Sequence, residues 1–277
     1  MRGALLAAVL LITNVGAAAA QGMPGVDVKD LEADEIIALG VLMSEGACPC
    51  NPKISLVECI QQKACPAATE LASFGAARFR DGDGVDEVRE AVVRKYMADH
   101  VTFTFDLSTT PKKGAPDGRI KIVEFADFEC PHCALMRPLL DEVAKAYPKD
   151  VTLYFKQFPL PHHIYAEAAS RATLAAHRQG RFWPMHDLIF THQTQLEEGS
   201  FVAFATELGL NVEKFKTDMA DPAIAQQVQR DRQEGEDARM TGTPTVYVNG
   251  KLYAEDKSVD AMKAYIRQQL DKLAAQK

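Results

Sequence analysis

The chain has 277 residues, of which 47% are hydrophobic and 25% are charged, a balance that is typical of globular proteins. This length is enough for one large domain or for two smaller ones. The formal net charge is −7 and the basic residues are scattered along the sequence, which argues against a nucleic-acid-binding surface.

The first twenty residues have the pattern of a secretory signal peptide. One basic residue, Arg2, precedes an apolar core at 4–12, and small residues follow, with Ala18 and Ala20 spaced as at a signal-peptidase site. The apolar core is too short to span a bilayer comfortably. We therefore expect cleavage near Ala20 and a periplasmic or secreted protein. An uncleaved membrane anchor is the alternative.

Residues 21–97 are predicted to form a helical N-terminal segment. Apolar residues recur at helical spacing from residue 31 onward, and Ser55 and Glu58 match a capping box. Pro66 suits the first position of the next helix. The turn sequence DGDG then separates the last two predicted helices.

This segment contains four of the six cysteines: Cys48, Cys50, Cys59 and Cys65. An even number of cysteines in an exported chain is typical of disulfides. A bond between Cys48 and Cys50 would close a strained ring, so we expect these two to bond to Cys59 and Cys65, in either of two connectivities. Such structural disulfides would stabilise a small domain whose core is thin. An auxiliary redox pair and a zinc site are the alternatives.

From residue 98 onward the pattern changes to strands and helices. A strand is predicted at 101–107, and a loop rich in Pro and Gly follows it. Residues 119–128 are apolar on both faces, which is typical of a central strand. A helix that begins near Pro131 and a strand at 151–160 complete a β-α-β unit.

The rest of the chain is predicted to be mainly helical. A long helical stretch covers about 163–240, and it is followed by a hairpin with a turn at Asn249 and Gly250. A helix at 258–276 closes the chain. No internal repeat is present.

The last two cysteines, Cys130 and Cys133, form the sequence CPHC where the central strand gives way to a helix. At a helix start, backbone N–H groups and the helix dipole favour a Cys130 thiolate and lower its pKa. Cys133 lies one turn further on, where it could bond to Cys130 and resolve a mixed disulfide. His132 could donate a hydrogen bond or carry positive charge near Cys130, which would make the disulfide a stronger oxidant. A static bridge and a metal site are the alternatives.

Glu124 lies six residues before Cys130, on the same strand face as Ile120 and Ile122. A carboxyl group at this position is expected to be buried, and burial raises its pKa. It could then take or give the proton of Cys133. The alternative is an ordinary solvent-exposed glutamate.

Several segments resemble the DsbA-like branch of the thioredoxin superfamily. They are VEFADFECPHC and GTPT, with FPLPHH, AAHRQGRFWPMHDLIF and LGLNVEKF between them in that order. The resemblance covers about residues 100–277. It implies an α/β fold, a thioredoxin fold with a large helical insertion at 98–277, preceded here by the small cysteine-containing helical domain at 21–97 and the signal peptide at 1–20.

The resemblance also implies roles for individual residues. Pro244 resembles the cis-proline that faces the active cysteine, and Thr243 precedes it, so both are expected to bind substrate. An ordinary trans proline at a strand start is the alternative. The family also has an acidic residue at the position of Glu124. No metal and no cofactor are implied, apart from the redox-active disulfide of Cys130 and Cys133.

The sequence therefore predicts an exported thiol–disulfide oxidoreductase that oxidises the thiols of folding proteins. A reductase or isomerase of the same fold, or a binding module with a structural disulfide, are the alternatives. As partners, the resemblance implies unfolded or folding exported proteins and a membrane quinone-linked thiol oxidase, either DsbB-like or vitamin K epoxide reductase-like. No nucleic-acid partner is expected.

Overall fold

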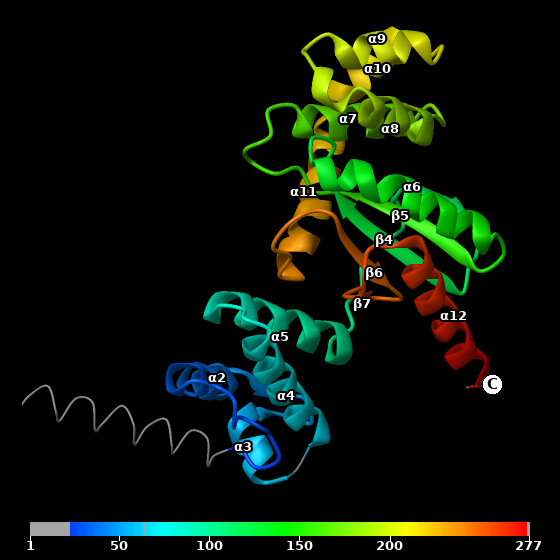
Figure 1. Cartoon of the computed structure of the whole chain (residues 1–277). Coiled ribbons are helices and arrows are strands. Elements are labelled where there is room, and N and C mark those ends of the chain that lie inside the picture. The colour runs from blue at the N-terminus through cyan, green and yellow to red at the C-terminus, as the bar shows by residue number, and fades with distance from the viewer. Residues whose placement is uncertain (1–22, 64, 276–277) are drawn as a thin grey trace, which may run out of the picture. The chain divides into compact units, whose positions relative to one another are not determined.

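The computed structural model of the chain describes residues 23–63 and 65–275 (Figure 1). The chain divides into two compact units, and the boundary falls between Val101 and Thr102. Each unit has its own hydrophobic core. The predicted signal peptide and its cleavage site lie outside the described residues.

The described part of the N-terminal unit contains four helices and a short hairpin. The helices are α2 (Ala33–Glu45), α3 (Leu56–Gln61), α4 (Pro66–Arg80) and α5 (Val85–His100). Two antiparallel strands, β1 (Ala47–Cys48) and β2 (Asn51–Ser55), lie between α2 and α3. The sequence prediction of a wholly helical segment missed this hairpin, because its strands are short and mostly exposed and so give no hydrophobic period.

Local sequence fixes where these helices begin. The backbone N–H of Glu58 donates to the Ser55 hydroxyl, and the Glu58 carboxylate accepts from the Ser55 backbone, which confirms the predicted capping box. Pro66 occupies the first turn of α4, as predicted. Further along α4, a Cβ on Gly75 would lie 2.9 Å from Leu39, so the glycine allows α4 to pack closely against α2.

The C-terminal unit is built on a five-stranded sheet in the order β3-β5-β4-β6-β7. The strands are β3 (Lys112–Gly114), β4 (Ile120–Ala126), β5 (Val151–Gln157), β6 (Thr245–Val248) and β7 (Lys251–Leu252). Strands β4 and β5 are parallel, whereas the other neighbours are antiparallel. Asn249 and Gly250 join β6 to β7 with φ values of 50° and 80°, which confirms the predicted hairpin turn.

The strand predicted at 101–107 is wrong, because this segment has no regular strand pairing. The Phe103 backbone N–H donates to the Gly250 carbonyl, and the Phe105 ring lies 4.9 Å from that of Tyr247. The alternating phenylalanines therefore reflect packing against one face of the sheet. The edge strand β3 lies instead in the segment that was predicted as a loop.

The two faces of β4 are covered differently. Ile120 and Ile122 face helices α6 (Pro131–Ala146) and α12 (Val259–Ala275) and share a core cluster with them. Phe125 faces the other side of the sheet, where it packs with Tyr247. Successive side chains of a strand point to opposite faces, so Glu124 lies on the same side of the sheet as Ile122, which is the α6 side.

The predicted helical insertion between β5 and β6 is confirmed. It contains α7 (Ala166–His177), α8 (Phe182–Thr191), the 3₁₀ helix η1 (Gln193–Gln195), α9 (Ser200–Glu207), α10 (Val212–Ala220) and α11 (Pro222–Asp237). These helices enclose a second core of the unit, which also holds Cys130 and Cys133. The chain thus has the predicted α/β class, a thioredoxin sheet with a large helical insertion.

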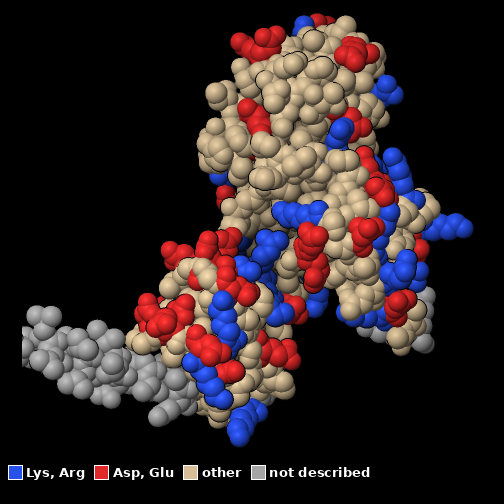
Figure 2. Space-filling model, in the orientation of Figure 1, with Lys and Arg blue, Asp and Glu red and all other residues tan. Residues whose placement is uncertain are grey.

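The surface of this unit carries mixed charge. Figure 2 shows acidic and basic side chains interspersed on the face in view, with mostly uncharged surface over α7 to α10. Among the described residues, no helix combines the length and the apolar character that a membrane span requires.

Candidate active site

Cys130 is the N-cap residue of α6, and Pro131 is the first residue of that helix. The backbone N–H of Cys133 donates to the Cys130 carbonyl at 3.0 Å, so the first turn is closed directly behind the sulfur. The Cys130 Sγ lies 3.3 Å from the backbone carbonyl oxygen of Thr243. The residue as a whole is 6% exposed, and its sulfur is not bonded to Cys133 in this structure.

Hydrogen bonds lower the pKa of Cys130 to about 5. The largest cause is the bond to the Cys133 side chain; burial opposes it. Thr243 and the backbone N–H groups of Cys133 and His132 add to the lowering. The His132 side chain itself is exposed. The groups that stabilise the thiolate therefore come from the helix start and from the loop before β6.

Cys133 has the opposite environment. It is fully buried, and burial raises the pKa of its thiol far above the usual range. The hydrogen bond to Cys130 and the charge of Glu124 raise it further. Its Sγ accepts a hydrogen bond of 3.5 Å from the Asp127 backbone N–H. At neutral pH the pair therefore consists of one thiolate and one thiol, which is the arrangement that disulfide exchange requires.

Thr243 and the adjoining Pro244 lie beside Cys130, although 113 residues separate Thr243 from Cys130 in sequence. The bond between Thr243 and Pro244 is cis. Strand β6 follows directly, and it pairs with β4, which leads to the CPHC segment. The sheet thus brings the two candidate segments together.

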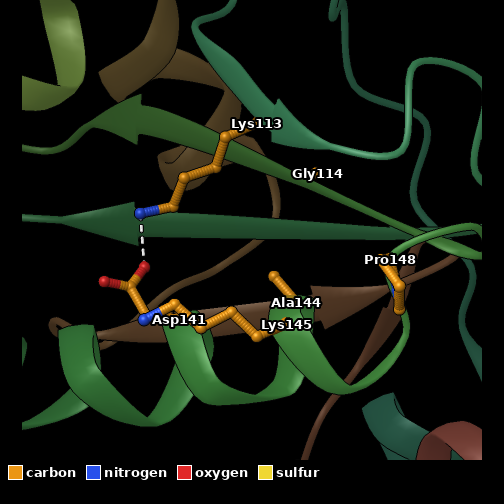
Figure 3. Close-up of a pocket in the computed structure, with 6 residues that line it drawn as sticks. All are labelled: Lys113, Gly114, Asp141, Ala144, Lys145 and Pro148. Carbon is orange, nitrogen blue, oxygen red and sulfur yellow. Dashed lines mark ion pairs between the residues drawn. The ribbon is translucent and has the colours of Figure 1, made fainter.

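Glu124 lies on β4 and is 4% exposed; burial raises the pKa of its carboxyl group to about 8. The charge of Lys113 lowers this pKa and the charge of Asp141 raises it. Lys113 and Asp141 form an ion pair with each other across a pocket of about 340 Å³ between β3 and α6 (Figure 3). The Lys113 ammonium also lies 3.9 Å from the centre of the Trp183 ring.

Two polar residues at the site were missed by the sequence prediction. The first is Gln193, in η1 of the helical insertion. Its side-chain amide donates to the carbonyl oxygens of Phe128, at 2.7 Å, and of Cys130, at 3.0 Å. Both carbonyls belong to the loop that leads to Cys130. A glutamine in a polar segment gives no sequence signal for such a contact.

The second is Asp127, which follows β4 and is fully buried. Its carboxylate accepts hydrogen bonds from the backbone N–H groups of Glu129, at 2.7 Å, and Leu160, at 2.6 Å. It also contacts the Nδ1 atom of His163 at 2.9 Å. Asp127 thereby joins the active-site loop to the segment after β5. The sequence did offer one signal for Asp127, because a charged residue directly after an apolar strand is unusual enough to suggest a specific role.

The N-terminal cysteines are paired as Cys48–Cys59 and Cys50–Cys65. This is one of the two connectivities that the sequence left open. The sulfur atoms of Cys48, Cys59 and Cys65 lie within 4.8 Å of one another. All four sulfurs are bonded, whereas a zinc site would require thiolates.

Comparison with known proteins identifies the family. A family model described as thioredoxin matches residues 106–268, which is more than half of the chain. The chain therefore belongs to the thioredoxin family. Its fold is also similar to those of several proteins of known structure.

Three of those solved structures show the extent of the likeness. BdbD from Bacillus subtilis superposes with a TM-score of 0.55 at 23% identity, over 61% of this chain and 97% of that one. The catalytic domain of Proteus mirabilis ScsC gives 0.53 at 21%, over 66% and 98%. A thioredoxin-like oxidoreductase from Silicibacter pomeroyi gives 0.52 at 23%, over 61% and 94%. At these identities the likeness establishes the fold.

Curated relatives match in sequence over a shorter part. A protein named Na⁺/H⁺ antiporter NhaA from Herminiimonas arsenicoxydans is 37% identical over 139 residues, which are 50% of this chain and 22% of the relative. NhaA 3 from Salinispora tropica is 33% identical over 155 residues, 56% of this chain and 24% of the relative. The chain thus matches less than a quarter of the length of these relatives. Ion antiport is the activity given in the names of those whole proteins.

Proposed function

We propose that this chain is an exported thiol–disulfide oxidoreductase that oxidises the thiols of folding proteins through Cys130 and Cys133. The observation that carries the proposal is the contrast between the two cysteines, since the pKa of Cys130 is lowered to about 5 while that of Cys133 is raised. A well-stabilised thiolate favours the dithiol form. A stable dithiol form makes the corresponding disulfide a strong oxidant.

In the oxidising direction, a substrate thiolate attacks the Cys130 sulfur of the disulfide, and the Cys133 sulfur leaves. The leaving sulfur takes up a proton because its pKa is raised. Glu124 supplies that proton, since a pKa of about 8 keeps its carboxyl group protonated at neutral pH. A second substrate thiolate then attacks the substrate sulfur of the mixed disulfide and releases Cys130 as thiolate. The substrate gains a disulfide, and its two electrons remain on Cys130 and Cys133.

Thr243 and Pro244 are the proposed substrate-binding residues. Because the Thr243 carbonyl oxygen lies 3.3 Å from the Cys130 sulfur, a peptide whose cysteine reaches that sulfur passes the Thr243 backbone. An extended peptide can bind there through main-chain hydrogen bonds, which recognise chains of many sequences. Such binding suits unfolded or folding exported proteins as substrates.

The enzyme must be reoxidised after each turnover. The DsbA-like fold supports a membrane quinone-linked thiol oxidase as the electron acceptor, either DsbB-like or vitamin K epoxide reductase-like. Export by the predicted signal peptide would place the chain in the periplasm or outside the cell, where disulfides persist. The redox-active disulfide itself supplies the chemistry, so the proposed reaction uses no further cofactor.

The reduction potential of Cys130 and Cys133 tests the proposal. The full chain is equilibrated in glutathione buffers, the free thiols are alkylated, and peptides from each cysteine pair are quantified by mass spectrometry. An oxidase should have a potential above about −200 mV, whereas a value near −270 mV would indicate a reductase. A pair that never equilibrates would identify a structural bridge. In parallel, Cys130→Ser should abolish the oxidation of a reduced test protein.

A further inference from the structure

The two disulfides of the N-terminal unit differ in their access to solvent. Cys48 and Cys59 are both fully buried in the core of the unit. Cys50, in contrast, is exposed in the turn between β1 and β2, while its partner Cys65 is 2% exposed. Cys50 is therefore the exposed end of its disulfide in the folded unit, whereas both ends of Cys48–Cys59 are shielded.

Cys65 occupies the same local position as the candidate nucleophile of the C-terminal unit. It is the N-cap residue of α4, a helix of 15 residues, and Pro66 is in the first turn. Cys130 and Pro131 have this arrangement at the start of α6. A thiolate at a helix start is stabilised by the free backbone N–H groups and the helix dipole, so Cys65 is suited to leave a disulfide as thiolate.

Two neighbouring features favour the release of Cys65. A pocket of about 380 Å³ is lined by Cys65, together with Pro66 and Lys63. The pocket gives the released sulfur room to hydrate and move. Lys63 brings a positive charge to the same pocket, and a nearby cation stabilises a thiolate.

We propose that Cys50–Cys65 is a second exchangeable disulfide, which accepts cysteine thiolates at Cys50. The incoming thiolate forms a mixed disulfide with the Cys50 sulfur, and Cys65 leaves as thiolate. If the attacking molecule carries a second thiol, its thiolate attacks its own sulfur in the mixed disulfide and releases Cys50. The dithiol is then oxidised to a disulfide, and Cys50 and Cys65 hold the two electrons.

The buried disulfide can take part in a following step. The sulfur of Cys65 lies within 4.8 Å of those of Cys48 and Cys59. The Cys65 thiolate therefore stands next to the bond between them. Attack on either sulfur forms a new disulfide with Cys65 and releases the other cysteine as thiolate, with no net change in oxidation state.

Limited reduction of the full chain tests this proposal independently of the C-terminal cysteines. A variant with Cys130→Ser and Cys133→Ser is incubated in native buffer with graded reduced glutathione, quenched with N-ethylmaleimide and mapped by mass spectrometry. We expect glutathione on Cys50 at concentrations that leave the Cys48–Cys59 pair oxidised. The maleimide should be on Cys65 where Cys48–Cys59 stays intact, and on Cys48 or Cys59 where that disulfide has exchanged onto Cys65. Opening of Cys48–Cys59 before Cys50–Cys65 would overturn the proposal.

Two further outcomes are decisive. Resistance of both disulfides until the unit is denatured would show that both are structural, and glutathione on Cys65 would contradict attack at Cys50. Lys63→Met should slow the reaction by about two- to fivefold, as expected for removal of one nearby surface charge. Lys53→Met, a matched change on the exposed strand β2, should leave the rate unchanged. Equal rates in the two variants would overturn the role of Lys63.

Discussion

The side-chain amide of Gln193 donates a hydrogen bond of 3.0 Å to the backbone carbonyl of Cys130. A residue of the helical insertion thereby holds the loop that carries the candidate nucleophile. The same amide also holds the carbonyl of Phe128 at 2.7 Å, so the loop is held on both sides of Glu129. We infer that Gln193 is a positioning residue, because it acts on the Cys130 sulfur only through the backbone.

Gln193→Met should raise the pKa of Cys130. Methionine has a similar length but no donor, so the loop would be free to turn the sulfur away from the N–H groups that stabilise its thiolate. A lost hydrogen bond of about 1 kcal/mol corresponds to about 0.7 pKa unit, which sets the expected scale. The ultraviolet absorbance of the thiolate, followed against pH, measures this pKa.

Gln195→Met is the matched control, since Gln195 lies in the same short helix. It should leave both the thiolate titration and the reduction potential unchanged. Equal titrations for wild type and Gln193→Met would show that the active-site loop does not depend on the insertion.

Much of this site could be predicted from the sequence, because its main parts are local. The apolar strand before CPHC and the Pro after Cys130 fix where β4 ends and where α6 begins. Gln193 and Asp127 act on backbone groups that only the tertiary fold brings near them, and no local pattern marks such contacts. The strand prediction at 101–107 failed for a related reason. Alternating apolar and polar residues indicate that one face of a segment is buried, but they do not show that the segment pairs with another strand.

Replacing Cys133 should separate its two contributions to catalysis. Cys133→Ala removes the largest cause of the lowered Cys130 pKa, so that pKa should rise. Cys133→Ser keeps a hydroxyl donor and should raise it less. Both variants should accumulate mixed disulfides through Cys130, because no resolving thiol remains. Identical titrations of the alanine and serine variants would contradict a hydrogen bond from residue 133 to the thiolate.

The stability of the dithiol form should depend on pH. Folding lowers the pKa of Cys130 from 9.0 to about 5. A lowered pKa contributes stability that is fully present above the unfolded value and is lost as the pH falls through the folded value. The free energy of unfolding of the dithiol form should therefore rise, relative to the disulfide form, between about pH 5 and pH 9.

Urea unfolding followed by tryptophan fluorescence measures this difference, because the single tryptophan, Trp183, reports on the C-terminal unit alone. The double variant Cys130→Ala, Cys133→Ala is the control. Adding reductant to this variant should leave the free energy of unfolding of its C-terminal unit unchanged. That free energy should also lack the rise with pH that is expected for the wild-type dithiol form. A constant difference between the two redox forms of the wild type across the range would contradict the lowered pKa.

Lys113 and Asp141 should shift the pKa of Glu124 in opposite directions. Lys113→Met removes the charge that lowers the pKa of Glu124, so that pKa should rise above about 8. Asp141→Asn removes a charge that raises it, so the pKa should fall. Carbon-13 NMR of the glutamate side chains measures the titration, with Glu124→Gln to assign the signal. Lys145→Met, on α6 at the same pocket, should leave the pKa unchanged. Shifts of the same sign in the Lys113 and Asp141 variants would mean that water entering the pocket, and not charge, sets the pKa of Glu124.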